Sequence, residues 1–284
     1  MTYVAIASSR HSRGATTTAL ALTAAWPAGR AVLHVEAEPA GGDVVSLFHL
    51  RTEPSLLTLA AAARARVGAD DIAEHVQRLP GEPGAEVLVA PVDPRQARAA
   101  VAALARAGLG HALAALDSDV VADVGRLDPD SPSLELFAAA DVRAAVLRPT
   151  LNDVDHLQTR LALLAAVGVD DVHLVVVGEG RWGPDELVRA VGAAGVLAVM
   201  ADDPKGAAAL GTHEGAAKAL RRTQLWRSAR KLTEQVIALG AAGTIEEEPP
   251  DPRAAPARPP APGRAGRAAP PRWSRPRRAQ SPAQ

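Results

Sequence analysis

The stretch YVAIASSRHSRGATTT, residues 3–18, passes from a short apolar run through a polar loop into a segment rich in alanine and threonine. An apolar run of this length, Tyr3–Ala7, is typical of a strand that is covered on both faces of a sheet. The residues that follow, Thr16–Trp26, favour a helix. A strand that leads directly into a helix is the first half of a βαβ unit, so the stretch predicts a parallel sheet.

The same alternation continues to about residue 240. Further strands are expected at Ala31–Ala37, Glu86–Ala90, Asp119–Val124, Arg143–Leu147, His173–Val177 and Val196–Met200. Further helices are expected around Pro54–Arg66, Asp70–Arg78, Pro94–Ala107, Leu134–Ala139, Asp153–Val167, Asp185–Val191 and Lys218–Leu239. Strands joined by crossover helices in this way predict a three-layer, doubly wound α/β fold with a mostly parallel sheet.

The composition changes near residue 240. Residues 251–284 contain eight arginines against one acidic residue, Asp251, and eleven of the 23 prolines lie between Pro249 and Pro282. Such a segment buries too little apolar surface to offset the entropy that its ordering would cost. We therefore expect one folded domain at 1–240 and a disordered basic tail, rich in Pro, Arg and Ala, at 241–284.

Two residue types are scarce in a way that excludes whole classes of chemistry. The chain has no cysteine, which excludes a disulfide framework, a thiolate nucleophile and a zinc site built on sulfur. Its only lysines are Lys205, Lys218 and Lys231, so no lysine can form a Schiff base or bind a phosphate in the first 204 residues. No apolar run is long enough to span a membrane, and the sequence predicts a soluble cytoplasmic protein.

The polar loop after the first strand has the length and the position of a phosphate-binding loop. The standard motif is G-x-x-x-x-G-K-[ST], in which backbone amides surround phosphates, lysine adds a charge and the hydroxyl binds magnesium. Ser9 stands at the first glycine, Gly14 at the second, Ala15 at the lysine and Thr16 at the hydroxyl. The candidate cofactor-binding residues are therefore Ser9, Ser12, Arg13, Gly14, Ala15, Thr16 and Thr17. The alternative to a phosphate-binding loop is an ordinary polar connection between strand and helix, in which Ser12 or Thr16 caps the helix.

Carboxylates follow two more of the expected strands. Glu36 and Glu38 end the second strand and precede a glycine-rich turn, and Asp123 lies two residues before Gly125. Because the carboxyl ends of parallel strands meet at one edge of the sheet, we expect these groups to lie near the polar loop. Taken singly, the glutamates could be solvated and the aspartate could be a turn residue.

Together these loops resemble the MinD/ParA group of deviant-Walker ATPases, and especially its alanine-rich actinobacterial branch, over roughly residues 3–239. The family's loop reads K-G-G-x-G-K-[ST]. On this pattern Arg10 matches the signature lysine that reaches the phosphates across the dimer, and Ala15 replaces the central lysine. The resemblance implies a P-loop NTPase-like fold of the SIMIBI type, with ATP and magnesium as cofactors.

The resemblance also implies a role for each matched residue. Thr16 and Glu36 would bind magnesium, and Asp123 would bind it through water. Glu38 would be the hydrolytic carboxylate and Arg10 a second catalytic group. Later in the chain, Gly178 and Pro204 match the region that meets the base.

Family members switch between a monomer and an ATP-bound dimer and position cellular machinery. The resemblance thus implies a role in chromosome partitioning, in division-site placement or in pilus or secretion assembly, the last as in the CpaE type. Because Ala15 removes a positive charge from the phosphate site, we expect weak or no ATP hydrolysis. The alternative is a scaffold that needs no nucleotide and acts through protein contacts and its basic tail.

The expected partners are a second copy of the chain, an unidentified protein and, through the tail arginines, DNA or an anionic membrane. A solvated tail without a binding role is equally compatible with the composition. The expected location is the cytoplasm, including peripheral contact at the nucleoid or the inner face of the membrane.

Overall fold

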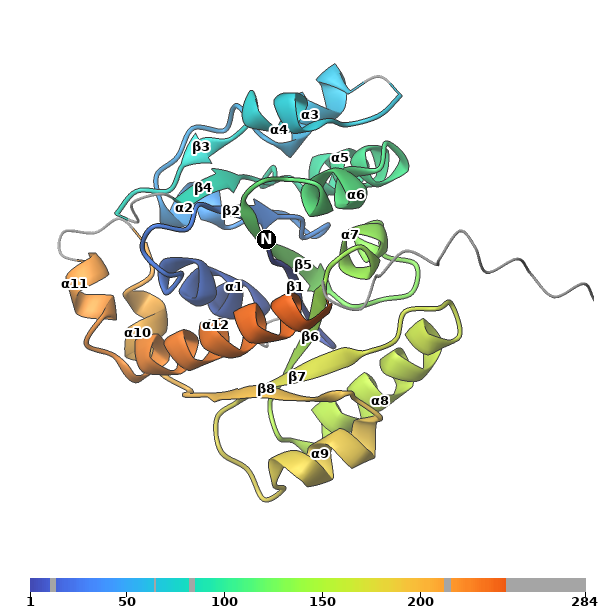
Figure 1. Cartoon of the computed structure of the whole chain (residues 1–284), viewed down its shortest axis with the longest axis vertical. Helices are drawn as coiled ribbons and strands as arrows, with labels where there is room; N and C mark the ends of the chain where they lie inside the picture. Colours follow the sequence, from blue (N-terminus) through green and yellow to red (C-terminus); the bar gives the residue numbers. More distant parts are fainter. Residues whose placement is uncertain (11–13, 64, 82–84, 212–215, 244–284) are drawn as a thin grey trace, which may run out of the picture. The chain divides into compact units, whose positions relative to one another are not determined.

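The structure is a computed structural model, and it describes residues 1–10, 14–63, 65–81, 85–211 and 216–243 (Figure 1). Its centre is an eight-stranded sheet with the strand order β3-β4-β2-β5-β1-β6-β7-β8. The strands are β1 (Tyr3–Ser8), β2 (Val32–Glu36), β3 (Gln77–Arg78), β4 (Ala85–Leu88), β5 (Asp119–Arg126), β6 (Val142–Leu147), β7 (Val172–Val177) and β8 (Gly195–Met200). All neighbouring strands are parallel except β3 and β4. The predicted three-layer, mostly parallel fold is therefore confirmed.

The helices are α1 (Ala15–Ala24), α2 (Val44–Leu47), α3 (Leu56–Ala62), α4 (Ala69–Ala73), α5 (Pro94–Arg106), α6 (Leu109–Ala114), α7 (Leu134–Ala138), α8 (Leu151–Ala165), α9 (Pro184–Val191), α10 (Pro204–Ala208), α11 (Ala216–Leu220) and α12 (Gln224–Gly243). Helices α5, α9 and α10 each begin with proline at the first helical position, where the missing N–H costs no hydrogen bond.

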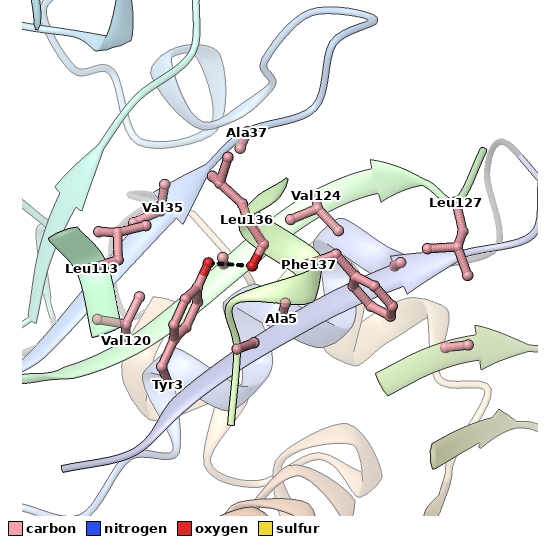
Figure 2. Close-up of a cluster of buried hydrophobic side chains, with 14 of the residues drawn as sticks. Tyr3, Ala5, Val35, Ala37, Leu113, Val120, Val124, Leu127, Leu136 and Phe137 are labelled. Carbon is pink, nitrogen blue, oxygen red and sulfur yellow. Dashed lines mark hydrogen bonds between the residues drawn. The ribbon is translucent and has the colours of Figure 1, made fainter. Parts of the chain in front are cut away.

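Each face of the sheet carries its own apolar core. One core joins alternate residues of the central strands to α1 and α12, among them Val4 and Ile6 of β1. The other core joins the intervening residues to α3, α5, α7, α8 and α9. Figure 2 shows part of this second core, in which Tyr3 lies among aliphatic side chains. The Tyr3 hydroxyl donates to the Leu136 carbonyl oxygen over 2.6 Å, so its polar end is satisfied in the interior.

Two sequence expectations need correction, and three short helices were not expected. The helix expected at Asp70–Arg78 ends at Ala73, and Gln77–Arg78 instead forms the short antiparallel edge strand β3. The single helix expected at Lys218–Leu239 is two helices, α11 and α12, because the chain turns at residues 221–223. The sequence pattern does not predict the short helices α2, α6 and α10.

The expected domain boundary stays a prediction. Helix α12 continues three residues beyond Gly240, to Gly243. The tail predicted to be disordered lies, from residue 244 on, outside the described residues. None of the described helices combines the length and the apolarity that crossing a bilayer requires.

Candidate functional site

The site lies at the carboxyl edge of the sheet, where β2, β5, β1 and β6 are consecutive neighbours. Loops that follow these strands enclose a cavity of about 550 Å³. The described residues that line it are Ser8, Gly14, Ala15, Thr16, Thr17, Glu36, Glu38, Ala40, Gly41, Asp43 and Arg148. The convergence expected from the three sequence segments is thus present in the fold.

The first wall of the cavity is the N-terminus of α1. Gly14 precedes this ten-residue helix in the left-handed conformation, with φ 93°, which glycine adopts without strain. No described side chain caps the helix, and its first turn contains no acidic residue. Its first amides therefore carry the partial positive charge of a helix N-terminus toward the cavity, which is the usual arrangement for binding an anion.

Next to this helix N-terminus, a hydrogen bond connects α1 to β5. The Thr16 hydroxyl donates to Asp123 Oδ2 over 2.6 Å, and the Gly125 amide donates to Asp123 Oδ1 over 3.0 Å. Asp123 is fully buried in β5, opposite Ile6 of β1. Burial raises the pKa of the Asp123 carboxyl to about 6, and the nearby charges of Glu38 and Asp43 act in the same direction.

Glu36 holds the loop after β2 in place. Its Oε1 accepts from the amides of Asp43 (2.6 Å) and Val44 (3.0 Å), and its Oε2 accepts from the Ala90 amide (3.0 Å). Burial raises the pKa of the Glu36 carboxyl to about 7, although these three amides favour the charged form. Both carboxylate oxygens of Glu36 thus already accept hydrogen bonds from backbone amides. Its predicted role as a magnesium ligand stays a prediction.

Glu38 reaches back toward β5. Its Oε1 accepts from the Ala40 amide over 2.9 Å, and its carboxylate lies directly against Gly125. A Cβ on residue 125 would overlap that carboxylate, and Gly125 also has a φ of +69°. The positive φ is the main reason for glycine here, because the Glu38 carboxylate is the flexible end of a side chain and can move aside. The charge of Glu38 also acts on Asp123, whose pKa it helps to raise.

Among the described residues that line the cavity, Arg148 is the cation, and no sequence motif predicted it. It follows β6 directly, and β6 pairs with β1 so that Val146 lies opposite Ser8. Its guanidinium binds the Asp202 carboxylate in a bidentate pair, with Nη1–Oδ2 2.5 Å and Nη2–Oδ1 3.0 Å. The only sequence signal was its position immediately after a strand next to β1.

The remaining predicted residues are placed as follows. Ser9 is fully buried and is not among the lining residues, and its hydroxyl has no partner within the described part of the chain. Arg10 is partly exposed and accepts a hydrogen bond at its carbonyl oxygen from Ser8 Oγ over 2.8 Å. Ser12 and Arg13 lie outside the described residues.

The two residues predicted for the base region lie at the ends of β7 and β8. Gly178 follows β7 with φ +82°, and a Cβ added to it would lie 3.3 Å from the Cβ of Asp202. Pro204 is exposed and begins α10, one residue after Asp203. The loops after β6, β7 and β8 therefore meet at Asp202, beside the cavity.

The residues of the cavity fit a magnesium-bound nucleotide in their chemistry. Hydroxyl and carboxylate oxygens are the ligands that Mg²⁺ prefers, and it normally keeps several waters and completes its shell with substrate phosphates. Among the residues that the structure describes, no group of three or more His, Asp or Glu side chains is arranged to hold a metal by itself. Thr16 and Asp123 would hold the ion together with phosphate oxygens, and the α1 amides would hold the phosphates.

Comparison with protein-family models gave no match, and no curated protein sequence matched either. Solved structures did match. A ParA family ATPase from Chlorobium tepidum TLS aligns with a TM-score of 0.66 and 15% identity over 83% of this chain and 97% of that one. The cell division ATPase MinD from Pyrococcus furiosus aligns with a TM-score of 0.64 and 18% identity over 84% of this chain and 99% of that one.

A third match is the septum site-determining protein MinD from Pyrococcus horikoshii OT3, with a TM-score of 0.64 and 16% identity over 85% of this chain and 98% of that one. At sequence identities this low, the matches establish a shared fold. The shared fold extends over nearly the whole length of each solved protein. The chain therefore has the fold of the MinD/ParA family ATPases.

Proposed function

We propose that the chain is a MinD/ParA-like positioning protein that binds ATP and magnesium in the cavity at the carboxyl edge of its sheet. The observation that carries the proposal is the meeting of the uncapped N-terminus of α1 with the Thr16–Asp123 pair in one cavity. The helix offers amides to phosphates, and the pair offers oxygens to the ion that accompanies them.

Solved proteins of the same fold support this choice of ligand. The MinD of Pyrococcus horikoshii was solved in complex with Mg-ADP, and a variant of McdA from Cyanothece, at a TM-score of 0.56 and 18% identity, was solved as a complex with ATP. A MinC:MinD cell division complex of Aquifex aeolicus shares the fold at a TM-score of 0.55 and 13% identity. These relatives support a nucleotide-dependent role with a protein partner, in partitioning or division-site placement. A role in pilus or secretion assembly is proposed from the sequence resemblance alone.

We further propose that hydrolysis of ATP is weak or absent. Ala15 is the first residue of α1 and places a methyl group where the motif has its lysine. Removing one positive contact to the transferred phosphate commonly lowers the rate of phosphoryl transfer by orders of magnitude. Glu38 lies beside Asp123 and is the carboxylate that would orient an attacking water, so the base is kept while the cation is lost.

Dimerisation is the proposed output of binding, with Arg10 reaching the phosphates bound by the second copy. The partner protein is unidentified, and contact with DNA or an anionic membrane is assigned to the tail arginines. The proposed location is cytoplasmic, at the nucleoid or the inner face of the membrane when the tail is bound.

The test is titration calorimetry of the full chain with a non-hydrolysable ATP analogue and magnesium. Thr16→Ala removes the hydroxyl that contacts Asp123 and is expected to weaken binding about tenfold, which corresponds to the roughly 1.4 kcal/mol of one lost polar contact. Thr159→Ala makes the same chemical change at an exposed site on α8 and is the matched control. Light scattering with and without the analogue then reports the dimer.

Two outcomes would decide against the proposal. Equal affinities for Thr16→Ala and Thr159→Ala would place the nucleotide elsewhere. No measurable affinity at millimolar analogue, together with an unchanged oligomeric state, would favour the scaffold that works without nucleotide.

A further inference from the structure

The cavity has an unusual balance of charge for a phosphate site. Three of its lining side chains are acidic, Glu36, Glu38 and Asp43, and buried Asp123 lies next to them. Among the described lining residues Arg148 is the only cation, since Ala15 stands in the position of the motif's lysine. A polyanionic ligand in such a cavity requires positive charge beyond that of one helix N-terminus.

Arg148 is placed well to supply that charge. The pairing of β6 with β1 puts it near the start of the phosphate loop, and its amide donates to buried Asp153 Oδ2 over 3.2 Å. Its backbone is therefore anchored at the start of α8, while a third of its side chain is exposed and lines the cavity. A guanidinium presents parallel N–H groups that fit a phosphate as well as they fit a carboxylate.

In the structure this guanidinium is engaged by Asp202, which is 47% exposed. An exposed ion pair of this kind contributes little net stability, so an exchange of partners costs little. Asp202 sits after β8 and holds the two N–H groups in the same bidentate way that two phosphate oxygens would.

We propose that Arg148 supplies the phosphate-binding cation that Ala15 cannot, and that Asp202 occupies its guanidinium in the ligand-free protein until a phosphate displaces the carboxylate. The inference rests on the proposed nucleotide site and names a residue that its motif does not contain. It makes Asp202 an internal competitor of the nucleotide. Binding of the nucleotide then loosens the contact between the loops after β6 and β8.

The direction in which two substitutions change nucleotide affinity separates this role from a merely structural one. Arg148→Gln and Asp202→Asn both break the same ion pair. If the pair only tied two loops together, both variants would change nucleotide affinity in the same direction. On our proposal Arg148→Gln weakens binding of the ATP analogue with magnesium about tenfold or more, and Asp202→Asn tightens it several-fold, because the competitor is gone.

The experiment measures binding of the ATP analogue and of adenosine to the full chain, with Arg189→Gln on exposed α9 as the matched loss of one charge. The Arg148→Gln effect should vanish for adenosine, which has no phosphate. Ala15→Lys in the Arg148→Gln background should restore affinity for the analogue. Thermal melting of each variant checks that the fold is intact.

The two ways in which the experiment can fail are distinct. If the unchanged protein binds the analogue and Arg148→Gln binds it equally well, or if both pair-breaking variants shift affinity in one direction, the inference is wrong and the proposed function stands. If neither the unchanged protein nor Asp202→Asn binds the analogue at millimolar concentration, the inference and the proposed function fail together.

Discussion

Ala15 is 7% exposed and lines the cavity, so we expect a longer side chain at this position to extend into the cavity. We predict that Ala15→Lys raises affinity for the ATP analogue about tenfold and produces measurable phosphate release from ATP, because a cation returns to the charge that develops in the transition state. Adding Glu38→Ala should abolish that release. Ala40→Lys brings the same charge to the same cavity from an exposed loop position. If Ala15→Lys and Ala40→Lys raised affinity and phosphate release equally, the gain would come from added positive charge in general and not from the position of Ala15.

Gly125 has a positive φ, and a Cβ added to it would displace the Glu38 carboxylate, the flexible end of that side chain. We predict that Gly125→Ala destabilises the fold by about 2 kcal/mol, mainly through backbone strain, with a smaller cost for moving the Glu38 carboxylate away from the Ala40 amide. Gly108→Ala is the control, since its φ is +77° but nothing lies within 4 Å of its added Cβ, and about 1 kcal/mol is expected. Urea unfolding measures both. Glu38→Ala should recover the steric part of the Gly125→Ala loss, and full additivity of the two changes would contradict the contact.

At the scale of elements, Asp203 connects two helices that adjoin the site. Its Oδ1 accepts from the Gly206 amide of α10 (2.9 Å), and its Oδ2 accepts from the amides of Gln224 (2.9 Å) and Leu225 (3.1 Å) at the start of α12. These amides hold the pKa of the Asp203 carboxyl below its usual value. One carboxylate therefore caps two helix N-termini.

We predict that Asp203→Ala costs about 2 kcal/mol or more of unfolding free energy, roughly twice the value of an ordinary cap. Asp93→Ala provides the comparison, because Asp93 caps α5 alone, through the Arg95 amide at 2.8 Å. Urea denaturation of the two variants gives the ratio. Equal losses would show that the second helix start does not depend on Asp203.

Most strands were predictable from sequence because strands buried on both faces are mostly apolar. The missed strand β3 is two polar residues, Gln77 and Arg78, which carry no periodic signal and pair only because β4 has a free edge. The break before α12 was also missed. There the Thr223 hydroxyl donates to the Leu220 carbonyl oxygen over 2.6 Å and accepts from the Trp226 amide over 3.1 Å. The helical spacing of apolar residues continues across this turn, so the sequence pattern does not indicate the break.

For the site, the sequence predicted the positions of the residues that belong to recognisable motifs. Thr16, Glu38 and Asp123 were expected at one edge and lie there. Arg148 was missed because its place in the cavity depends on the register of β6 against β1, which no local pattern encodes. The hydrogen bond of Glu36 to the Ala90 amide was missed for a similar reason, since Ala90 lies 54 residues away in sequence and follows β4, the strand that pairs with β2.

At the scale of the whole molecule, buried ionisable groups link stability to pH. Burial raises the pKa of Glu36 to about 7, so between its unfolded value near 4.5 and about 7 the folded protein binds more protons than the unfolded chain. Stability from this group is therefore greatest below pH 4.5 and falls as pH rises through 7. His34 acts oppositely, because burial lowers its pKa to about 4 and the unfolded chain gains a proton first as pH falls below 6.5.

Because buried Asp123, whose pKa is raised to about 6, acts in the same direction as Glu36 while His34 opposes both, the total stability curve is a poor test, and a difference between variants is needed. We predict that the unfolding free energy of the unchanged protein minus that of Glu36→Gln increases steadily as pH is lowered from about 8 to about 5. His34 contributes equally to both proteins, and Asp123 affects the difference only through the repulsion between its charge and that of Glu36. Urea unfolding at half-unit pH steps measures this difference. Glutamine cannot reproduce every amide contact of Glu36, so a constant offset is expected at all pH values and only the slope is diagnostic. A difference that stays flat across this range, or that grows as pH rises, would show that Glu36 is already ionised in the folded protein.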